Sequence, residues 1–433
     1  MENFSVVLFL LAVVIGLSAL ADKIRIPYPI LLILAGLAIG FIPQLPDVEL
    51  NPEIIFLIFL PPLLFDAAFN ISAREFKTNF HTITTLAIPL VFITAAGIAV
   101  VAHYLIPGMS WPVSFVLGAL LSATDAVAAT GITKGLGLPG RIKTILEGES
   151  LVNDASALIA YRFAVAAVTG TSFIIWKASL SFLVLMGGGL IVGIIISLIL
   201  DFILVRVRHN LQVSISLMLL MPFVTYLLAE ELQVSGVIAV VTLGLSLARF
   251  SRKAFPEKMK FQSKSIWDTI IFLLNGLIFI LIGLEFPVIV KSIDPDHIAR
   301  YIGYGFIITL VALVLRTARV LIQKIYLERA FRASGERVSK YALLDLKDSI
   351  IVSWSGMRGI ISLAIAIGLP LTIGNGQVFP ERNHIIFISV VVVLFTLLGQ
   401  GLSLPWLVRR LKIGESTLPL TGEINVSPVR NND

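Results

Sequence analysis

The sequence contains no cysteine and few charged residues. Lys, Arg, Asp and Glu together make up 14% of the 433 residues, whereas a typical soluble domain carries about 25%. Hydrophobic residues make up 57% and the mean hydropathy is +0.96, which leaves too little polar surface to coat a soluble globule. The composition therefore excludes a soluble multidomain enzyme and a disordered chain, and the missing cysteines exclude a disulfide scaffold.

Long apolar runs recur along the whole chain, and each is long enough to cross a bilayer as a helix. They predict thirteen spans near residues 4–20, 28–42, 53–69, 82–106, 112–131, 144–168, 178–204, 211–229, 234–248, 266–286, 301–323, 349–371 and 385–407. The first run lacks a basic leader and an A-x-A site, so we interpret it as a retained span. The sequence thus predicts an all-α polytopic membrane protein.

Lys and Arg gather in alternate loops, most densely in 249–265. Basic loops stay on the cytoplasmic side, so we expect the N-terminus outside and the C-terminus inside. In a membrane protein, the net charge of +6 reflects such loops, which anionic lipids attract, and does not indicate a nucleic-acid partner. Residues 1–411 are the predicted transmembrane domain, and 412–433 a short, disordered cytoplasmic tail.

Five ionisable residues stand out inside otherwise apolar spans. A charge at mid-span costs about 2.5–3.5 kcal/mol on insertion scales, so such residues are functional candidates by default. They are Asp66, Asp125, Glu149, Asp154 and Arg358.

The sixth span carries a polar stripe. Ser150 and Asp154 are four residues apart and Ser150 and Asn153 three apart, so on a helix the three side chains share one face. Hydroxyl, amide and carboxylate oxygens are ligands for hard cations. A buried carboxylate favours a proton unless a cation neutralises it. Competition of cation and proton for one carboxylate is the simplest chemistry of exchange.

Two spans are rich in small residues and predict interrupted helices. One contains Thr124 and Asp125, and the other contains Gly356 and Gly359. Interrupted segments at corresponding positions of two halves indicate a binding site at mid-membrane. We therefore expect two inverted repeats, with spans 4–6 and 11–13 as a core and spans 1–3 and 7–10 as a scaffold and dimer region.

Four motifs resemble those of the NhaP and sodium–proton exchanger family. Residues 149–155 (ESLVNDA) are similar to its G-E-S-x-x-N-D-A signature, and 124–128 (TDAVA) to its T-D/P-x-A-V segment. Residues 60–67 (LPPLLFDA) resemble its L-P-P-x-x-x-D/E-A motif, and 356–359 (GMRG) its G-x-R-G. The motifs occur in family order, and the resemblance covers essentially the whole transmembrane region.

The resemblance implies an NhaA/NhaP-like fold and a homodimer that exchanges Na⁺ for H⁺ by elevator-type alternating access. Because the sequence shows no long regulatory tail, we expect a prokaryotic inner membrane. An Asn-Asp pair at this site goes with electroneutral one-for-one exchange. No resident cofactor is expected, because Na⁺ and H⁺ are cargo. By motif match, Na⁺ would be bound by Asp154, with Ser150, Asp125, Thr124 and Asp66 completing the coordination.

The resemblance also implies supporting roles for three residues. Asn153 would hold the unwound Thr124 region by hydrogen bonds, while Glu149 and Arg358 would form a buried ion pair that joins the halves of the core. From position alone, Arg162 in the sixth span is an alternative partner for Glu149.

Other functions stay open on the residues alone. Li⁺ or K⁺ is an alternative cation, because residue identities do not resolve ionic size. A cation channel would need a repeated pore element or rings of charge, whereas these acids come from different spans. An intramembrane hydrolase lacks support, since neither H-E-x-x-H nor G-x-S-x-G occurs. A polytopic receptor or scaffold would not need four acids inside the membrane.

Overall fold

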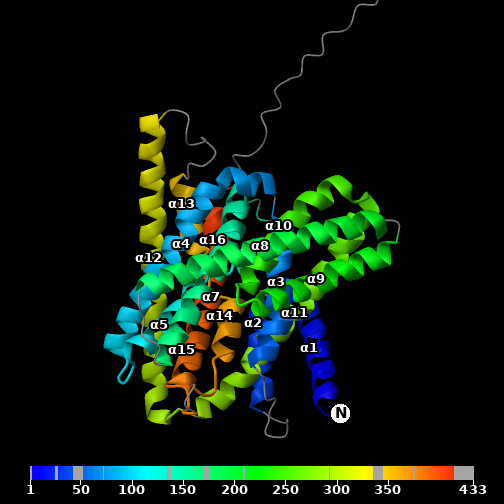
Figure 1. The fold of residues 1–433 in the computed structure, drawn as a ribbon. Helices are drawn as coiled ribbons and strands as arrows, with labels where there is room; N and C mark the ends of the chain where they lie inside the picture. Colours follow the sequence, from blue (N-terminus) through cyan, green and yellow to red (C-terminus); the bar gives the residue numbers. More distant parts are fainter. Residues whose placement is uncertain are drawn as a thin grey trace, which may run out of the picture.

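The computed structural model describes residues 2–24, 28–41, 52–71, 73–133, 136, 138–169, 175–207, 210–291, 293–334, 345–373 and 376–413. Helices account for nearly all of these residues (Figure 1). The first half contains α1 (Glu2–Ile24), α2 (Tyr28–Gly40), α3 (Pro52–Asn70), α4 (Ala73–Leu105), α5 (Trp111–Ser122), α6 (Ala126–Ile132), α7 (Gly140–Val168) and α8 (Ile175–Val207). The second contains α9 (Leu211–Glu231), α10 (Gly236–Ala254), α11 (Glu257–Lys291), α12 (Pro295–Ser334), α13 (Leu346–Trp354), α14 (Ile360–Ile367), α15 (Arg382–Phe395), the π-helical turn η2 (Thr396–Gly401) and α16 (Leu402–Arg410).

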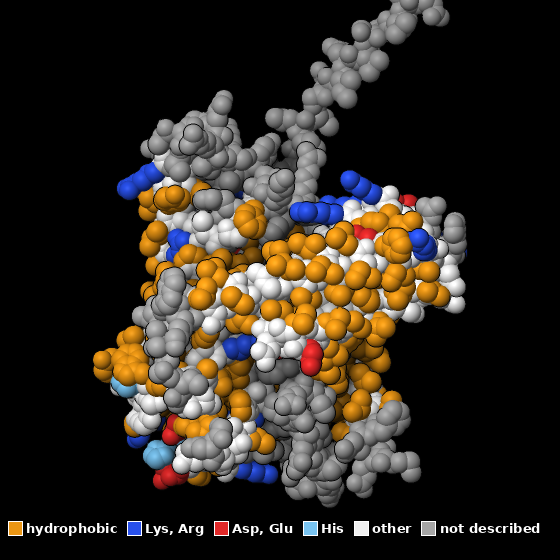
Figure 2. All heavy atoms as spheres, in the orientation of Figure 1, with side chains coloured by type: hydrophobic (Ala, Val, Ile, Leu, Met, Phe, Trp, Pro, Cys, Tyr) orange, Lys and Arg blue, Asp and Glu red, His pale blue; other side chains and the backbone are white. Residues whose placement is uncertain are grey.

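Each predicted span falls on a helix or on an interrupted pair of helices, so the all-α membrane fold is confirmed. Within the described residues, seven helical segments are long and apolar enough to cross a membrane, and four shorter apolar helices accompany them. The remaining spans are α10 and the broken pair α13/α14. Hydrophobic side chains cover much of the described surface in Figure 2, as expected where lipid tails are the solvent.

Both expected interruptions are present. The chain leaves the helical conformation at Ala123, where ψ is 141°, and α6 resumes after Asp125. In the second half, α13 ends at Trp354 and α14 begins at Ile360. The two unwound segments meet, because the Asp125 backbone N–H donates to Met357 O at 2.8 Å.

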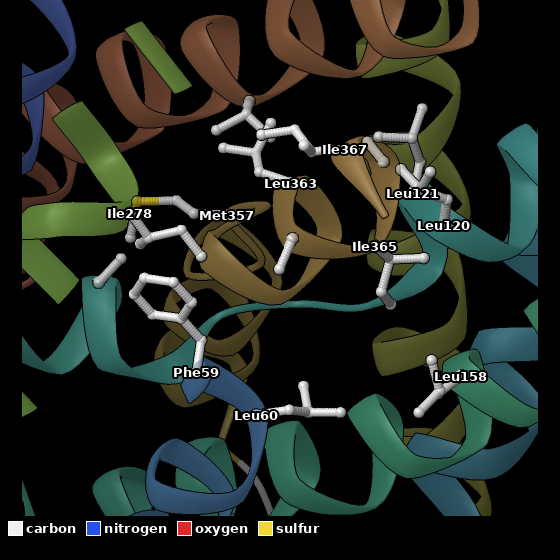
Figure 3. Packing of buried hydrophobic residues seen from close by; sticks show 14 of the residues in the cluster. Phe59, Leu60, Leu120, Leu121, Leu158, Ile278, Met357, Leu363, Ile365 and Ile367 are labelled. Carbon is white, nitrogen blue, oxygen red and sulfur yellow. The ribbon is translucent and has the colours of Figure 1, made fainter. Parts of the chain in front are cut away.

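The same order of elements surrounds each interruption: a long helix, a broken helix and a further long segment. The first set is α4, α5/α6 and α7, and the second is α12, α13/α14 and α15–η2–α16. The sets pack against each other through α4 and α12 and through α5 and α14. Leu120 and Leu121 of α5 lie beside Ile365 and Ile367 of α14 (Figure 3), so the crossing is embedded in a buried apolar core.

Several helices extend beyond their predicted spans, and α4 begins at Ala73, ahead of the predicted position 82. The segment after the predicted span 301–323 is helical up to Ser334, where α12 ends, and Lys324 pairs with Glu328 at 2.6 Å one turn away. Helix α11 begins at Glu257, ahead of the predicted position 266. Charged pairs spaced three or four residues apart support such helical ends in water, and hydropathy does not detect them. Of the predicted tail, residues 414–433 lie outside the described residues.

Candidate cation site at the helix crossing

A cavity of about 80 Å³ lies at the crossing of the two unwound segments. All five residues proposed from the sequence as cation ligands line it: Asp66, Thr124, Asp125, Ser150 and Asp154. They come from three places in the chain, namely α3, the gap between α5 and α6, and α7. The broken helices therefore collect in one place oxygen atoms that are far apart in the sequence.

Helix α7 presents Ser150 and Asp154 to the cavity one turn apart. Ser150 Oγ donates to Thr124 O at 2.9 Å and lies 3.5 Å from Asp154 Oδ2. Asp154 is only 8% exposed, so its charge is poorly solvated by bulk water. A carboxylate in this position needs a proton or a cation to neutralise it.

Asn153, on the adjacent position of α7, supports the unwound segment. Its Nδ2 donates to Thr124 Oγ1 at 2.9 Å, which is the kind of contact expected for it. Together with the Ser150 bond, this contact ties both the side chain and the carbonyl of Thr124 to α7. Irregular backbone is tolerated at membrane depth only where such partners satisfy it.

Asp125 has a structural contact as well as a place in the cavity. Its Oδ1 accepts from the Ala128 backbone N–H at 3.1 Å and so caps the start of α6. Its Oδ2 lies against Gly359, where an added Cβ would be 1.8 Å from that oxygen. The second glycine of the GMRG motif is therefore required by the close approach of this carboxylate.

Asp66 lines the same cavity from α3. Its Oδ1 accepts from Asn70 Nδ2 at 2.8 Å, one turn further along the helix. Among the described residues, no three carboxylate or histidine side chains form a metal cluster by themselves. The cavity also offers hydroxyl, amide and backbone carbonyl oxygens.

The prediction that Glu149 pairs with Arg358 is wrong. Glu149 instead forms a two-pronged ion pair with Arg316 of α12, at 2.5 Å from Nη1 and 2.9 Å from Nη2. Both side chains are buried, at 1% exposure each. Arg316 also donates from Nε and Nη2 to Val352 O, so the pair joins α7, α12 and α13.

Arg358 is directed to backbone carbonyls. Its Nε donates to Leu121 O at 2.7 Å and its Nη1 to Gly356 O at 2.9 Å. These carbonyls lie next to the two interruptions, where the regular helical hydrogen bonds end. Arg358 therefore stabilises the crossing itself, while the charge of Glu149 is neutralised from α12.

Three polar residues at the site or near it were not predicted from the sequence, namely Arg316, Asn275 and Ser362. Arg316 was missed although it is a charge inside the predicted span 301–323, a signal that was available. Asn275 and Ser362 line the cavity, and the only sequence signal was a polar residue within an apolar span. Arg162 pairs with Glu230 of α9 at 2.7 Å, so it is not the partner of Glu149.

The fold and the cavity define a class: a polytopic membrane transporter built on discontinuous helices. Residues 9–410 match the family described as sodium/hydrogen exchanger, transmembrane. The chain belongs to this family, whose members are transporters and not enzymes.

Two relatives and one solved structure illustrate the similarity. The chain is 36% identical over 421 residues to the sodium, potassium, lithium and rubidium/H⁺ antiporter of Bacillus pumilus, covering 94% of this chain and 61% of the relative. It is 34% identical over 416 residues to the Na⁺/H⁺ antiporter ApNhaP of Aphanothece halophytica, covering 95% and 75%. The structure of the sodium proton antiporter MjNhaP1 from Methanocaldococcus jannaschii superposes with a TM-score of 0.73 at 21% identity, over 95% of this chain and 99% of that one, which shows the shared fold.

Proposed function

We propose that this protein exchanges a monovalent cation for H⁺ across the membrane, with cation and proton competing for Asp154. Na⁺ is the first candidate, and Li⁺ and K⁺ are alternatives, since the Bacillus pumilus relative is named for all three cations. The observation that carries the proposal is the single cavity that Asp154 shares with Asp66, Thr124, Asp125 and Ser150. A cation bound there would displace the proton, because one carboxylate cannot hold both.

The second part of the proposal concerns movement. The two sets of helices around the interruptions, α4–α7 and α12–α16, form a core that carries Thr124, Asp125, Ser150 and Asp154. Helices α1–α3 and α8–α11 form a scaffold and dimer region, against which the core moves as an elevator. Support comes from the two repeated sets of elements and from the Glu149–Arg316 pair, which joins α7 to α12 inside the core.

The third part concerns charge and setting. Asn153 carries an uncharged amide, whose Nδ2 donates a hydrogen bond to Thr124 Oγ1. Because Asn153 adds no second negative charge beside Asp154, exchange is electroneutral at one cation per proton. The protein functions as a homodimer in a prokaryotic inner membrane, where anionic lipids meet its basic loops. Its N-terminus faces outward and its C-terminus faces the cytoplasm.

The test uses purified protein in liposomes with an internal pH dye and an imposed proton gradient. Addition of Na⁺, Li⁺ or K⁺, but not choline, should dissipate the gradient. Asp154→Asn, which is isosteric but cannot ionise, should abolish the signal while leaving the folded protein intact. Asp296→Asn is a matched control, because Asp296 lies in the first turn of α12 and does not line the cavity. Exchange retained by Asp154→Asn would refute the site, and exchange by neither wild type nor variant would refute the function.

A channel is the second candidate, and the same assay separates it. A channel would move the cation without protons, so a cation gradient alone would set a membrane potential and leave the internal pH unchanged. The ligands of the cavity come once from three elements, not as a repeated ring, and this favours exchange.

A further inference from the structure

Two polar side chains of the cavity contain a buried oxygen that has no hydrogen-bond partner among the residues that the structure describes. They are Asn275 Oδ1 on α11 and Ser362 Oγ on α14, in side chains that are 3% and 1% exposed. Both residues line the cavity together with Asp154. Buried oxygens are nearly always hydrogen-bonded, so an unsatisfied one requires an explanation.

The position of Ser362 explains why its hydroxyl is unsatisfied. Buried helical serines usually donate to the carbonyl four residues earlier. Among the described residues, four buried serines do so, at 2.7–2.9 Å: Ser156, Ser349, Ser353 and Ser389. The residue four before Ser362 is Arg358, which lies in the unwound segment ahead of α14. The interruption therefore leaves a hydroxyl in the cavity with no partner from its own helix.

The Asn275 amide is oriented by a neighbouring helix. Its side chain is hydrogen-bonded to Tyr28 of α2. Because Oδ1 has no partner, the amide nitrogen is the group that faces Tyr28. Helix α11 is packed closely along α2, and an added Cβ on Gly283 would lie 2.3 Å from Ile33 O. The backbone that holds Asn275 is thus fixed, with the amide oxygen left for a ligand.

We propose that Asn275 Oδ1 and Ser362 Oγ are two further ligands of the transported cation. This inference rests on the proposed function and adds two helices, α11 and α14, to those that bind the ion. An amide or hydroxyl oxygen attracts a cation but does not bind a proton at neutral pH. These two ligands therefore raise cation affinity without adding a proton-binding group, whereas Asp154 responds to both ions.

The test compares Asn275→Leu and Ser362→Ala with two matched controls. Ser114→Ala and Thr225→Val also remove a buried hydroxyl that has no partner, but neither residue lines the cavity. In the liposome assay at fixed pH, each cavity variant should raise the Na⁺ or Li⁺ concentration for half-maximal exchange about 5- to 30-fold, which corresponds to about 1–2 kcal/mol. The maximal rate should stay within about twofold, and both controls should behave as wild type.

A binding measurement separates a ligand from a merely structural residue. Without Na⁺ or Li⁺, Ser362→Ala should melt no lower than wild type, because it removes only an unsatisfied buried atom. Asn275→Leu also loses the hydrogen bond to Tyr28, so its melting temperature is compared with and without Na⁺ and not with that of wild type. Added Na⁺ should raise the melting temperature of wild type, and the variants should need correspondingly more Na⁺ for the same rise. Ser362→Ala removes a single atom, so it provides the test even where Asn275→Leu fails to fold.

The outcomes distinguish this inference from the function on which it rests. Suppose that wild type exchanges cations, that Asp154→Asn is inactive, and that both cavity variants behave like the controls. This result would overturn the role of Asn275 and Ser362 and leave the proposed function intact. Wild type that neither exchanges cations nor gains thermal stability from them would overturn the proposed function itself.

Discussion

The ion pair of Glu149 and Arg316 should stabilise the transmembrane domain more than any charged contact that is exposed. Removing one partner leaves an uncompensated buried charge, which destabilises a protein by about 3–5 kcal/mol. Both side chains are almost completely buried and share two short N–O contacts. We therefore expect Glu149→Gln and Arg316→Met each to raise the unfolded fraction by two to three orders of magnitude or more.

A double-mutant cycle tests whether these two residues act as a pair. The combined variant Glu149→Gln/Arg316→Met leaves no lone charge at the contact, so its loss should fall well short of the sum of the single losses. Thermal unfolding of purified protein in detergent measures each variant. A parallel cycle of Glu149→Gln with Arg358→Met is the control, because Arg358 donates to Leu121 O and Gly356 O and not to Glu149.

The two cycles have opposite expected results. The coupling energy between positions 149 and 316 should reach at least about 2 kcal/mol, and that between 149 and 358 should be clearly smaller. Equal coupling in the two cycles would refute the assignment of Arg316 as the partner. Single variants as stable as wild type would refute the buried pair altogether.

Two further predictions concern transport. Gly359→Ala should abolish exchange in a protein that still folds, because the new Cβ would collide with Asp125 Oδ2. Gly187→Ala is the control, because the added Cβ there meets no neighbouring atom within 4 Å. Normal exchange by Gly359→Ala would contradict the described position of Asp125. Exchange should also be electroneutral, because Asn153 adds no charge next to Asp154. The exchange rate in liposomes should not change when valinomycin and K⁺ gradients set the membrane potential. Transport driven by the membrane potential alone would contradict one-for-one exchange.

Much of the architecture was predictable because its signals are local. A charged residue inside an apolar run can be recognised in the sequence whatever its partner is, because inserting a charge into the membrane is always unfavourable. The small residues around Thr124 and Gly356 likewise indicated the two interruptions, and both are present. The helical extension of α12 was not predicted, because it contains charged residues such as Lys324 and Glu328 and hydropathy detects only apolar segments.

The sequence by itself determined that this is a membrane protein with about thirteen spans, two broken helices and a buried carboxylate at Asp154. Only the tertiary structure decided which charges pair. Glu149 and Arg316 are 167 positions apart, and their contact depends on α7 packing near α12 while Arg358 is directed to carbonyls at the crossing. The same packing brings Asn275 into the cavity from α11. Such contacts follow from which helices are neighbours, and no local pattern of residues specifies that.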